Sequence, residues 1–149
     1  MRLVAFHPNT GTSLISKTAE YGLRAVIHIA GHGTSKPARA NDIALALDVP
    51  ANYLSKILHS LVRANLLTSE RGPRGGFRLA VLPEELRLAA IIEPLDPEVL
   101  HPVCLLGNAE CGGQETCSVH DHWKQVREPL LAFFAETTVA DVLGRVETA

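Results

Sequence analysis

The chain has 149 residues, of which 46% are hydrophobic and 20% charged, and its formal net charge is −2 at pH 7. This length and hydrophobic content are sufficient for a compact domain with a real core, and an odd number of cysteines, three, argues against a secreted disulfide framework. No apolar run is long enough to span a membrane and the N-terminus lacks a signal-peptide core, so we expect a cytoplasmic protein without a membrane partner.

The small net charge conceals two halves of opposite sign. Residues 1–80 contain ten Lys and Arg against four Asp and Glu, whereas residues 81–149 contain four against twelve. A basic half suits contact with a nucleic acid, and an acidic half repels phosphate and so favours one docking orientation. We therefore expect a nucleic acid to meet only the first half.

The N-terminal third begins with an extension, residues 1–13, which lacks sustained periodicity and is expected to be flexible. Ser16 can then cap a helix that continues to about Ala30 and ends at the Gly31–Gly33 segment. Glu20 lies in the first turns of this helix, where a carboxylate stabilises the positive end of the helix dipole. The residues expected on its buried side are Ala19, Leu23, Val26, Ile27 and Ala30.

Residues 41–63 have the pattern of a helix-turn-helix. Asn41 is a suitable N-cap for the first helix, and Val49-Pro50 should end that helix and start the next, because the residue before a proline is pushed out of the helical region. In the second helix, apolar residues recur at core-facing positions, Leu54, Ile57, Leu58, Leu61 and Val62. The opposite face carries Asn52, Ser55, Lys56, His59 and Arg63. This face is rich in donors and lacks acids, which suits a helix in a major groove, although a solvated face can have the same composition.

A hairpin is predicted directly after this motif. Leu66–Ser69 and Phe77–Leu79 have strand character, and Arg71–Gly76 between them is a glycine-rich turn. A helix-turn-helix followed by such a hairpin is a winged helix, in which Arg71 or Arg74 at the tip could meet phosphates or a narrow minor groove.

After the hairpin, Pro83 followed by Glu84 predicts the start of a further helix. Its expected buried residues are Leu86, Leu88, Ala89, Ile91 and Ile92. Pro94, Pro97 and Pro102 then begin a long loop that contains all three cysteines of the chain.

Cysteines confined to a loop are seldom packing residues. Six residues separate Cys104 from Cys111, five separate Cys111 from Cys117, and His120 follows closely. Three thiolates with an imidazole or a carboxylate suit an iron–sulfur cluster, and zinc would accept the same ligands. The composition of this segment therefore predicts a metal site without identifying the metal.

The final part of the chain predicts two helices. Ser118 can cap the first, whose apolar stripe needs a partner and consists of Trp123, Val126, Leu130, Leu131, Phe133 and Phe134. Pro129 should kink this helix or remove one hydrogen bond, which disfavours a straight coiled pairing. Thr138 and Asp141 can cap a last short helix that holds Val142 and Leu143.

Three segments, Ser16–Ala25, Tyr53–Leu58 and Arg71–Phe77, resemble the Rrf2 family of bacterial transcriptional regulators, and the resemblance extends over about residues 14–145. It implies a mainly α fold with a small β-hairpin wing, in which a winged helix-turn-helix domain is followed by a long C-terminal dimerisation helix. It also implies a homodimer that binds a double-stranded DNA operator. The residues expected to contact DNA are Ser16, Lys17, Asn52, Tyr53, Ser55, Lys56, His59, Arg71, Arg74 and Gly75.

The resemblance also bears on the metal. Cys104, Cys111 and Cys117 match the three cluster cysteines of family members that carry an iron–sulfur cluster, and His120 matches the histidine used there as fourth ligand. Glu20, reaching across from the other subunit, is the second candidate, and His122 is the third. A histidine ligand favours a [2Fe-2S] cluster and a carboxylate a [4Fe-4S] cluster. Alternatively, His120, and more so His122, simply belongs to the polar first turn of the next helix.

The resulting hypothesis divides the chain into an extension (1–13), a winged-helix domain (14–93), a cluster-binding loop (94–117) and a dimerisation and last helix (118–149). The protein is then a dimeric regulator whose DNA affinity responds to iron, cluster supply, nitric oxide or oxidants. One alternative is a metal-free repressor that senses through disulfide formation. Another is an enzyme with a Cys117–His120 pair, which is disfavoured because no oxyanion-stabilising group can be identified in the sequence.

Overall fold

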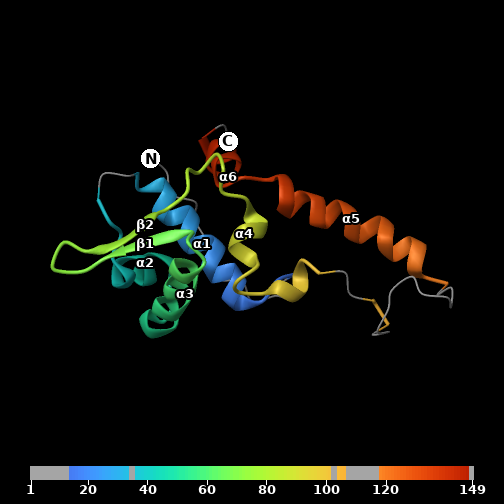
Figure 1. Ribbon diagram of the computed structural model, residues 1–149, viewed down its shortest axis with the longest axis horizontal. Coiled ribbons are helices and arrows are strands. Elements are labelled where there is room, and N and C mark those ends of the chain that lie inside the picture. The colour runs from blue at the N-terminus through green and yellow to red at the C-terminus, as the bar shows by residue number, and fades with distance from the viewer. Residues whose placement is uncertain (1–13, 34–35, 102–103, 107–117, 148–149) are drawn as a thin grey trace.

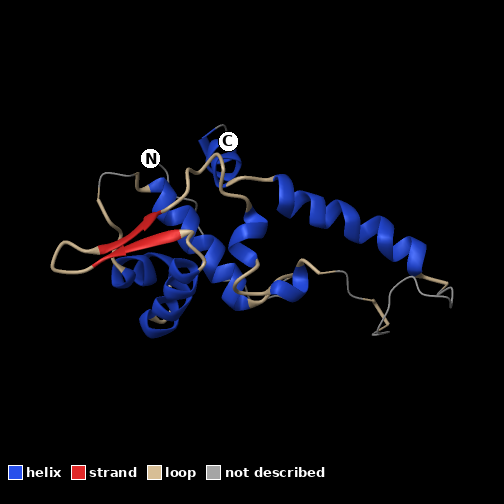
Figure 2. Cartoon of the chain, in the orientation of Figure 1, coloured by secondary structure: helices blue, strands red, loops and turns tan. Residues whose placement is uncertain are grey.

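A computed structural model describes residues 14–33, 36–101, 104–106 and 118–147, and the sequence-based expectations for residues 1–13, Cys111 and Cys117 lie outside these ranges. The predicted mainly α fold with a β-hairpin wing is confirmed (Figures 1 and 2). The elements in chain order are α1 (Lys17–Gly31), α2 (Ala40–Leu47), α3 (Ala51–Arg63), β1 (Leu67–Glu70), β2 (Gly76–Leu79), α4 (Leu88–Ile92), the 3-10 helix η1 (Pro97–Val99), α5 (His120–Glu136) and α6 (Val139–Glu147).

Helix α1 is the central element of the core. Ser16 caps it as predicted, because its Oγ accepts a hydrogen bond from the backbone N–H of Ala19 at 3.2 Å. Ala25 and Val26 are fully buried, and the helix packs against α2, α3, α4, α6 and β2. One buried face of α1 therefore joins the DNA-binding motif predicted from the sequence to the C-terminal end of the chain.

The helix-turn-helix is confirmed, but α2 begins two residues earlier than predicted. Its N-cap is Arg39, so Asn41 lies inside the first turn and its predicted capping role is wrong. The reason is that Ala38 and Phe77 exchange two backbone hydrogen bonds, at 2.9 and 2.8 Å, which fix an extended backbone just before Ala40. The break at Val49-Pro50 is confirmed, and Asp48 ends α2 in the left-handed conformation with φ 54°.

The wing is an antiparallel hairpin in which Leu67 pairs with Leu79 and Glu70 with Gly76. The first strand is shifted by one residue from the predicted Leu66–Ser69. Glycine is required at the turn, because a Cβ added to Gly75 would lie closer than 3.0 Å to the carbonyl oxygen of Glu70. The glycine-rich sequence thus permits the close return of the chain at the tip.

The helix predicted to start at Pro83 begins instead at Leu88, and Pro83–Glu85 form a turn. The backbone on either side of Arg87 pairs with the segment between α5 and α6. Val139 N–H donates to the carbonyl oxygen of Leu86 at 2.8 Å, and Leu88 N–H donates to that of Thr137 at 3.0 Å. This long-range pairing holds the backbone extended where the local sequence favours a helix. The predicted burial of Leu86, Leu88, Ile91 and Ile92 is confirmed, whereas Ala89 is half-buried.

The C-terminal part consists of α5, which extends away from the body of the molecule, and α6, which returns to it (Figure 1). Val119, not Ser118, is the N-cap of α5, and Pro129 lies inside the helix. The predicted cap of α6 is confirmed, because the backbone N–H of Thr138 donates to the Asp141 carboxylate at 2.8 Å and the Asp141 N–H donates to Thr138 Oγ1 at 3.1 Å. Across the described ranges, no helix is long and apolar enough to cross a membrane.

Candidate nucleic-acid interface and cysteine segment

Helix α3 has one buried and one exposed face, as its sequence predicts. Leu54, Ile57, Leu58 and Leu61 are buried in the main core, and Val62 is half-buried. On the opposite face, Asn52, Lys56, His59 and Arg63 are exposed and Ser55 is half-buried. The α3 side chains that could reach a base edge are therefore available to solvent.

Tyr53 ties the first turn of α3 to α1. Its hydroxyl shares a hydrogen bond with Thr18 Oγ1, and its ring packs edge-on against Tyr21 with the centroids 6.0 Å apart. Because of these contacts, the N-terminal turns of α1 and α3 lie side by side, and Ser16 and Lys17 belong to the same end of the molecule as the start of α3.

The wing presents exposed arginines and is held by side-chain contacts at β2 and near its tip. Arg71 and Arg74 are exposed and Gly75 is half-buried. His59 packs edge-on against Phe77 with the ring centroids 5.6 Å apart, which joins α3 to β2. Near the tip, Arg39 donates a hydrogen bond to the carbonyl oxygen of Pro73. The exposed face of α3 and the wing are thus held in a fixed relative position by side-chain contacts.

Further cations lie beside the wing. An open groove there is lined by Lys36, Pro37, Arg39, Glu70, Arg74 and Arg78. The acid in this set is already paired, because Glu70 Oε1 lies 2.8 Å from Arg78 Nε. The lining of this groove is therefore dominated by positive charge, which suits contact with phosphates.

The described part of the cysteine segment supplies some of the predicted metal ligands. Cys104 is buried, contrary to the expectation that loop cysteines are not packed, whereas Cys111 and Cys117 lie outside the described residues. His120 is the first residue of α5 and half-buried, and His122 is exposed. Among the described residues, no three His, Cys, Asp or Glu side chains form a metal-binding group. The donor set of three thiols and an imidazole nevertheless fits an iron–sulfur cluster chemically.

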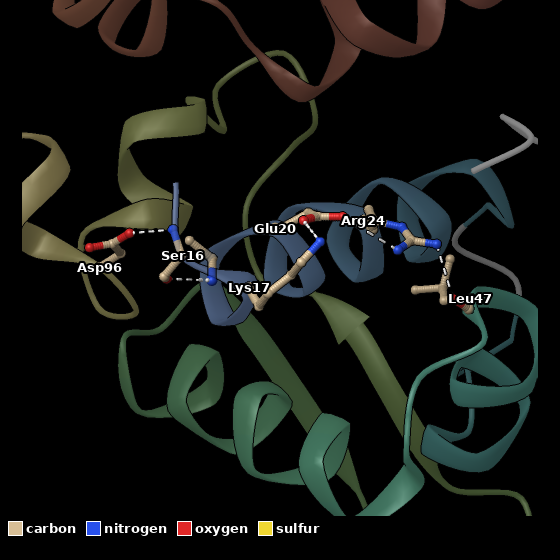
Figure 3. Close-up of polar contacts among 7 residues, drawn as sticks. Ser16, Lys17, Glu20, Arg24, Leu47 and Asp96 are labelled. Carbon is tan, nitrogen blue, oxygen red and sulfur yellow. Dashed lines mark hydrogen bonds and ion pairs between the residues drawn. The ribbon is translucent and has the colours of Figure 1, made fainter. Parts of the chain in front are cut away.

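Glu20 is engaged within its own helix (Figure 3). Its carboxylate lies 2.7 Å from Lys17 Nζ and 3.7 Å from Arg24 Nη1. The second candidate ligand therefore lies between two cationic side chains. Lys17 and Arg24 would have to share or give up their contacts with the Glu20 carboxylate if it bound a metal.

Several residues of this region were not identified from the sequence. Arg24 is buried and donates a hydrogen bond to the carbonyl oxygen of Leu47 at 3.0 Å, and Asp96 Oδ2 accepts the backbone N–H of Ser16 at 2.7 Å (Figure 3). His28 is also buried, and this burial lowers its pKa, with a further lowering from the nearby His32. A polar residue among the buried positions of α1 was the available signal for Arg24 and His28, whereas the contact of Asp96 is long-range and has no local signature.

A helix-turn-helix with an exposed polar recognition face and a fastened basic wing defines a winged-helix DNA-binding protein. Residues 15–145 match the Rrf2 family model, described as an iron-dependent transcriptional regulator, and the chain belongs to this family. Rrf2 regulators bind DNA and are typically dimeric, and they are not enzymes.

Known relatives agree with this assignment. An HTH-type transcriptional regulator of Aquifex aeolicus is 30% identical over 133 residues, which cover 88% of this chain and 92% of the relative. The structure of CymR, named as the global cysteine regulator of B. subtilis, superposes with a TM-score of 0.77 at 24% identity and covers 88% of this chain and 96% of CymR. IscR of T. potens superposes with a TM-score of 0.70 at 25% identity and covers 91% of this chain and 89% of that structure.

Proposed function

We propose that this transcriptional regulator reads an operator with the exposed face of α3 and holds the DNA backbone with its wing. The observation that carries the proposal is the placement of Lys56 and its polar neighbours on an exposed helix face that is fastened to an arginine-bearing hairpin. Asn52, Ser55, Lys56 and His59 would face base edges. Ser16, Lys17, Tyr53, Arg71, Arg74 and Gly75 would face phosphates or the minor groove.

Two substitutions test this division of labour on a duplex selected by the protein from a random-sequence pool. Lys56→Ala should weaken binding by about 1–3 kcal/mol and relax the preference at one base pair if it meets a base edge. Arg71→Ala should weaken binding to all sequences alike and lower the salt slope by about one if it meets a phosphate. Lys124→Ala is the matched control, because it removes an exposed lysine from α5, away from the wing. Unchanged affinity of both folded variants would refute the proposed interface.

The proposed regulator is a homodimer that pairs through α5. Val126 is 65% exposed and Phe133 45% exposed, although both belong to the apolar stripe of this helix, and a second copy of the chain would cover them. Residues 14–93 would then form the DNA-binding domain, 94–117 the cluster-binding loop and 118–149 the dimerisation and last helices, with α6 packed back on α1. Val126→Asp should give a monomer in sedimentation equilibrium, whereas Gln125→Asp, next to it on α5 and also exposed, should remain dimeric.

We further propose that Cys104, Cys111, Cys117 and His120 hold an iron–sulfur cluster, with Glu20 as the alternative fourth ligand. The family's description as iron-dependent and the similarity to IscR support this proposal. When bound, the cluster would supply a centre that responds to iron supply, oxidants or nitric oxide. The residues of this chain would contribute the ligands, and the burial of Cys104 would shield its thiolate from water.

A metal-free thiol switch is the second candidate, because the three cysteines all lie in one segment. The burial of Cys104 disfavours it, since exposed thiolates oxidise most readily. Protein purified without oxygen decides between the two: visible absorption with bound iron and sulfide supports the cluster, whereas colourless protein with three titratable thiols supports the switch.

A further inference from the structure

The segment that leads from α4 to the cysteines touches α1 at two points. The Asp96 carboxylate accepts a hydrogen bond from the backbone N–H of Ser16, the N-cap of α1, at 2.7 Å (Figure 3). The Leu95 side chain lies against Gly22, where an added Cβ would come closer than 3.0 Å to Leu95 Cδ1. Leu95 therefore occupies the space that a larger residue at position 22 would fill, and Asp96 fixes the start of the helix.

The same part of α1 contacts the recognition helix. Thr18 Oγ1 and the Tyr53 hydroxyl share a hydrogen bond, and a Cβ at Gly22 would lie 3.5 Å from Ile57 Cγ2. Tyr53 and Ile57 are one turn apart on α3, and Lys56 lies between them in the sequence. Between Ser16 and Gly22, α1 is thus in contact with the Leu95–Asp96 segment and with the DNA-reading part of α3 at once.

We propose that Asp96 and Leu95 are positioning residues for the recognition helix. They hold the N-terminal half of α1, which in turn holds the first turns of α3 through Thr18 and Gly22. A displacement of Leu95 and Asp96 is then transmitted to base recognition by a short chain of direct contacts. This inference rests on the proposed function, because it assigns a role in reading the operator.

A loss of positioning differs from a loss of charge or of stability in its effect on DNA binding. Base contacts need an accurately placed helix, whereas phosphate contacts tolerate small displacements. Asp96→Ala should therefore reduce the affinity for the selected operator by about 5- to 30-fold, while binding to a random duplex changes by less than about twofold. Asp96→Asn keeps an oxygen acceptor and should restore most of the loss. Glu98→Ala is the matched control, since it removes an exposed acid two residues further along.

Two further variants test the route itself. Thr18→Val removes the hydroxyl that meets Tyr53, and the double variant with Asp96→Ala should lose less specificity than the two single losses combined, because both act through one contact chain. Gly22→Ala should also lower operator affinity. Adding Leu95→Ala should recover part of the loss, because the new methyl group at position 22 then occupies the space of the removed Leu95 side chain. Thermal unfolding of each variant shows that the protein is folded.

The outcomes separate this inference from the proposed function. Loss of operator preference in Asp96→Ala with recovery in Asp96→Asn supports it. Wild-type operator affinity in folded Asp96→Ala, or equal losses on operator and random duplexes, would overturn the inference alone. Failure of the wild-type protein to prefer any duplex would overturn the proposed function and the inference with it.

Discussion

Arg24 donates a hydrogen bond to the carbonyl oxygen of Leu47 over 3.0 Å and so joins the middle of α1 to the last residue of α2 (Figure 3). The guanidinium is buried and lies 3.7 Å from the Glu20 carboxylate, so its charge is compensated inside the fold. A buried cation with these partners fixes where the first helix of the helix-turn-helix ends.

The first prediction concerns this bond. Arg24→Met keeps an unbranched side chain but leaves the Leu47 carbonyl without its charged donor, so the free energy of unfolding should fall by about 1–3 kcal/mol in urea denaturation. Arg63→Met, on the exposed end of α3, should change it by no more than about 0.5 kcal/mol. Equal effects of the two substitutions would show that the buried contact is unimportant for stability.

The second prediction separates the candidate fourth ligands of the cluster. If His120 is the ligand, His120→Ala should lose most of the bound iron, whereas His120→Cys should retain it, because a thiolate is an acceptable iron ligand. Glu20→Gln is a better probe than Glu20→Ala, since the amide keeps the size of a side chain that contacts Lys17 and Arg24.

Iron content and visible spectra of these variants, prepared without oxygen, provide the measurement. Loss of iron in Glu20→Gln with retention in His120→Ala would assign the ligand to the carboxylate and favour a [4Fe-4S] cluster. His122→Ala tests the third candidate, which is exposed in the same turn of α5, and should retain the iron if His120 or Glu20 is the ligand.

The third prediction is a pH dependence of stability. Burial and the nearby His32 lower the pKa of His28 from 6.5, the value expected for the unfolded chain. Below this pH the unfolded state binds more protons than the folded state, so the free energy of unfolding falls as the pH falls. His28→Gln should flatten this decline between about pH 7.5 and 5.5 in urea denaturation, whereas His122→Gln, which changes an exposed histidine, should not. Identical pH profiles for wild type and His28→Gln would contradict the prediction.

The fourth prediction compares two glycines. Gly75→Ala should disrupt the hairpin, because the new Cβ would collide with the backbone of Glu70, and should lower both stability and DNA affinity. Gly144→Ala lies inside α6, where an added Cβ meets no heavy atom of the described residues within 4 Å, and should raise stability by up to about 1 kcal/mol through helix propensity. The thermal midpoint should therefore fall for Gly75→Ala and rise for Gly144→Ala. The operator affinity should fall for Gly75→Ala and remain unchanged for Gly144→Ala.

Elements specified by local interactions could be predicted from the sequence. The Ser16 cap, the break at Val49-Pro50 and the Thr138–Asp141 cap depend on neighbours within a few residues, and all three are present. The exposed face of α3 follows from helical periodicity alone. In the candidate site, the exposed face of α3 is therefore the part that could be predicted from the sequence.

The incorrectly predicted starts of α2 and α4 have long-range causes. The helix expected at Pro83 is displaced because the backbone near Arg87 pairs with residues about fifty positions further on, including Thr138. The Asn41 cap is displaced by the pairing of Ala38 with Phe77. The contacts of Asp96 with Ser16 and of Arg24 with Leu47 are equally remote in sequence, so no local pattern could indicate them.

The pairing of Leu86 and Leu88 with Thr137 and Val139 also has a consequence for synthesis of the protein. Val139 is fully buried in the main core, and Leu143 packs against that core. During translation, the winged-helix region leaves the ribosome while these two residues are still to be made, so its core lacks both side chains until residue 143 has emerged. We expect part of the apolar surface of the nascent chain to stay uncovered until then, and specific DNA binding to begin only after α6 has left the ribosome.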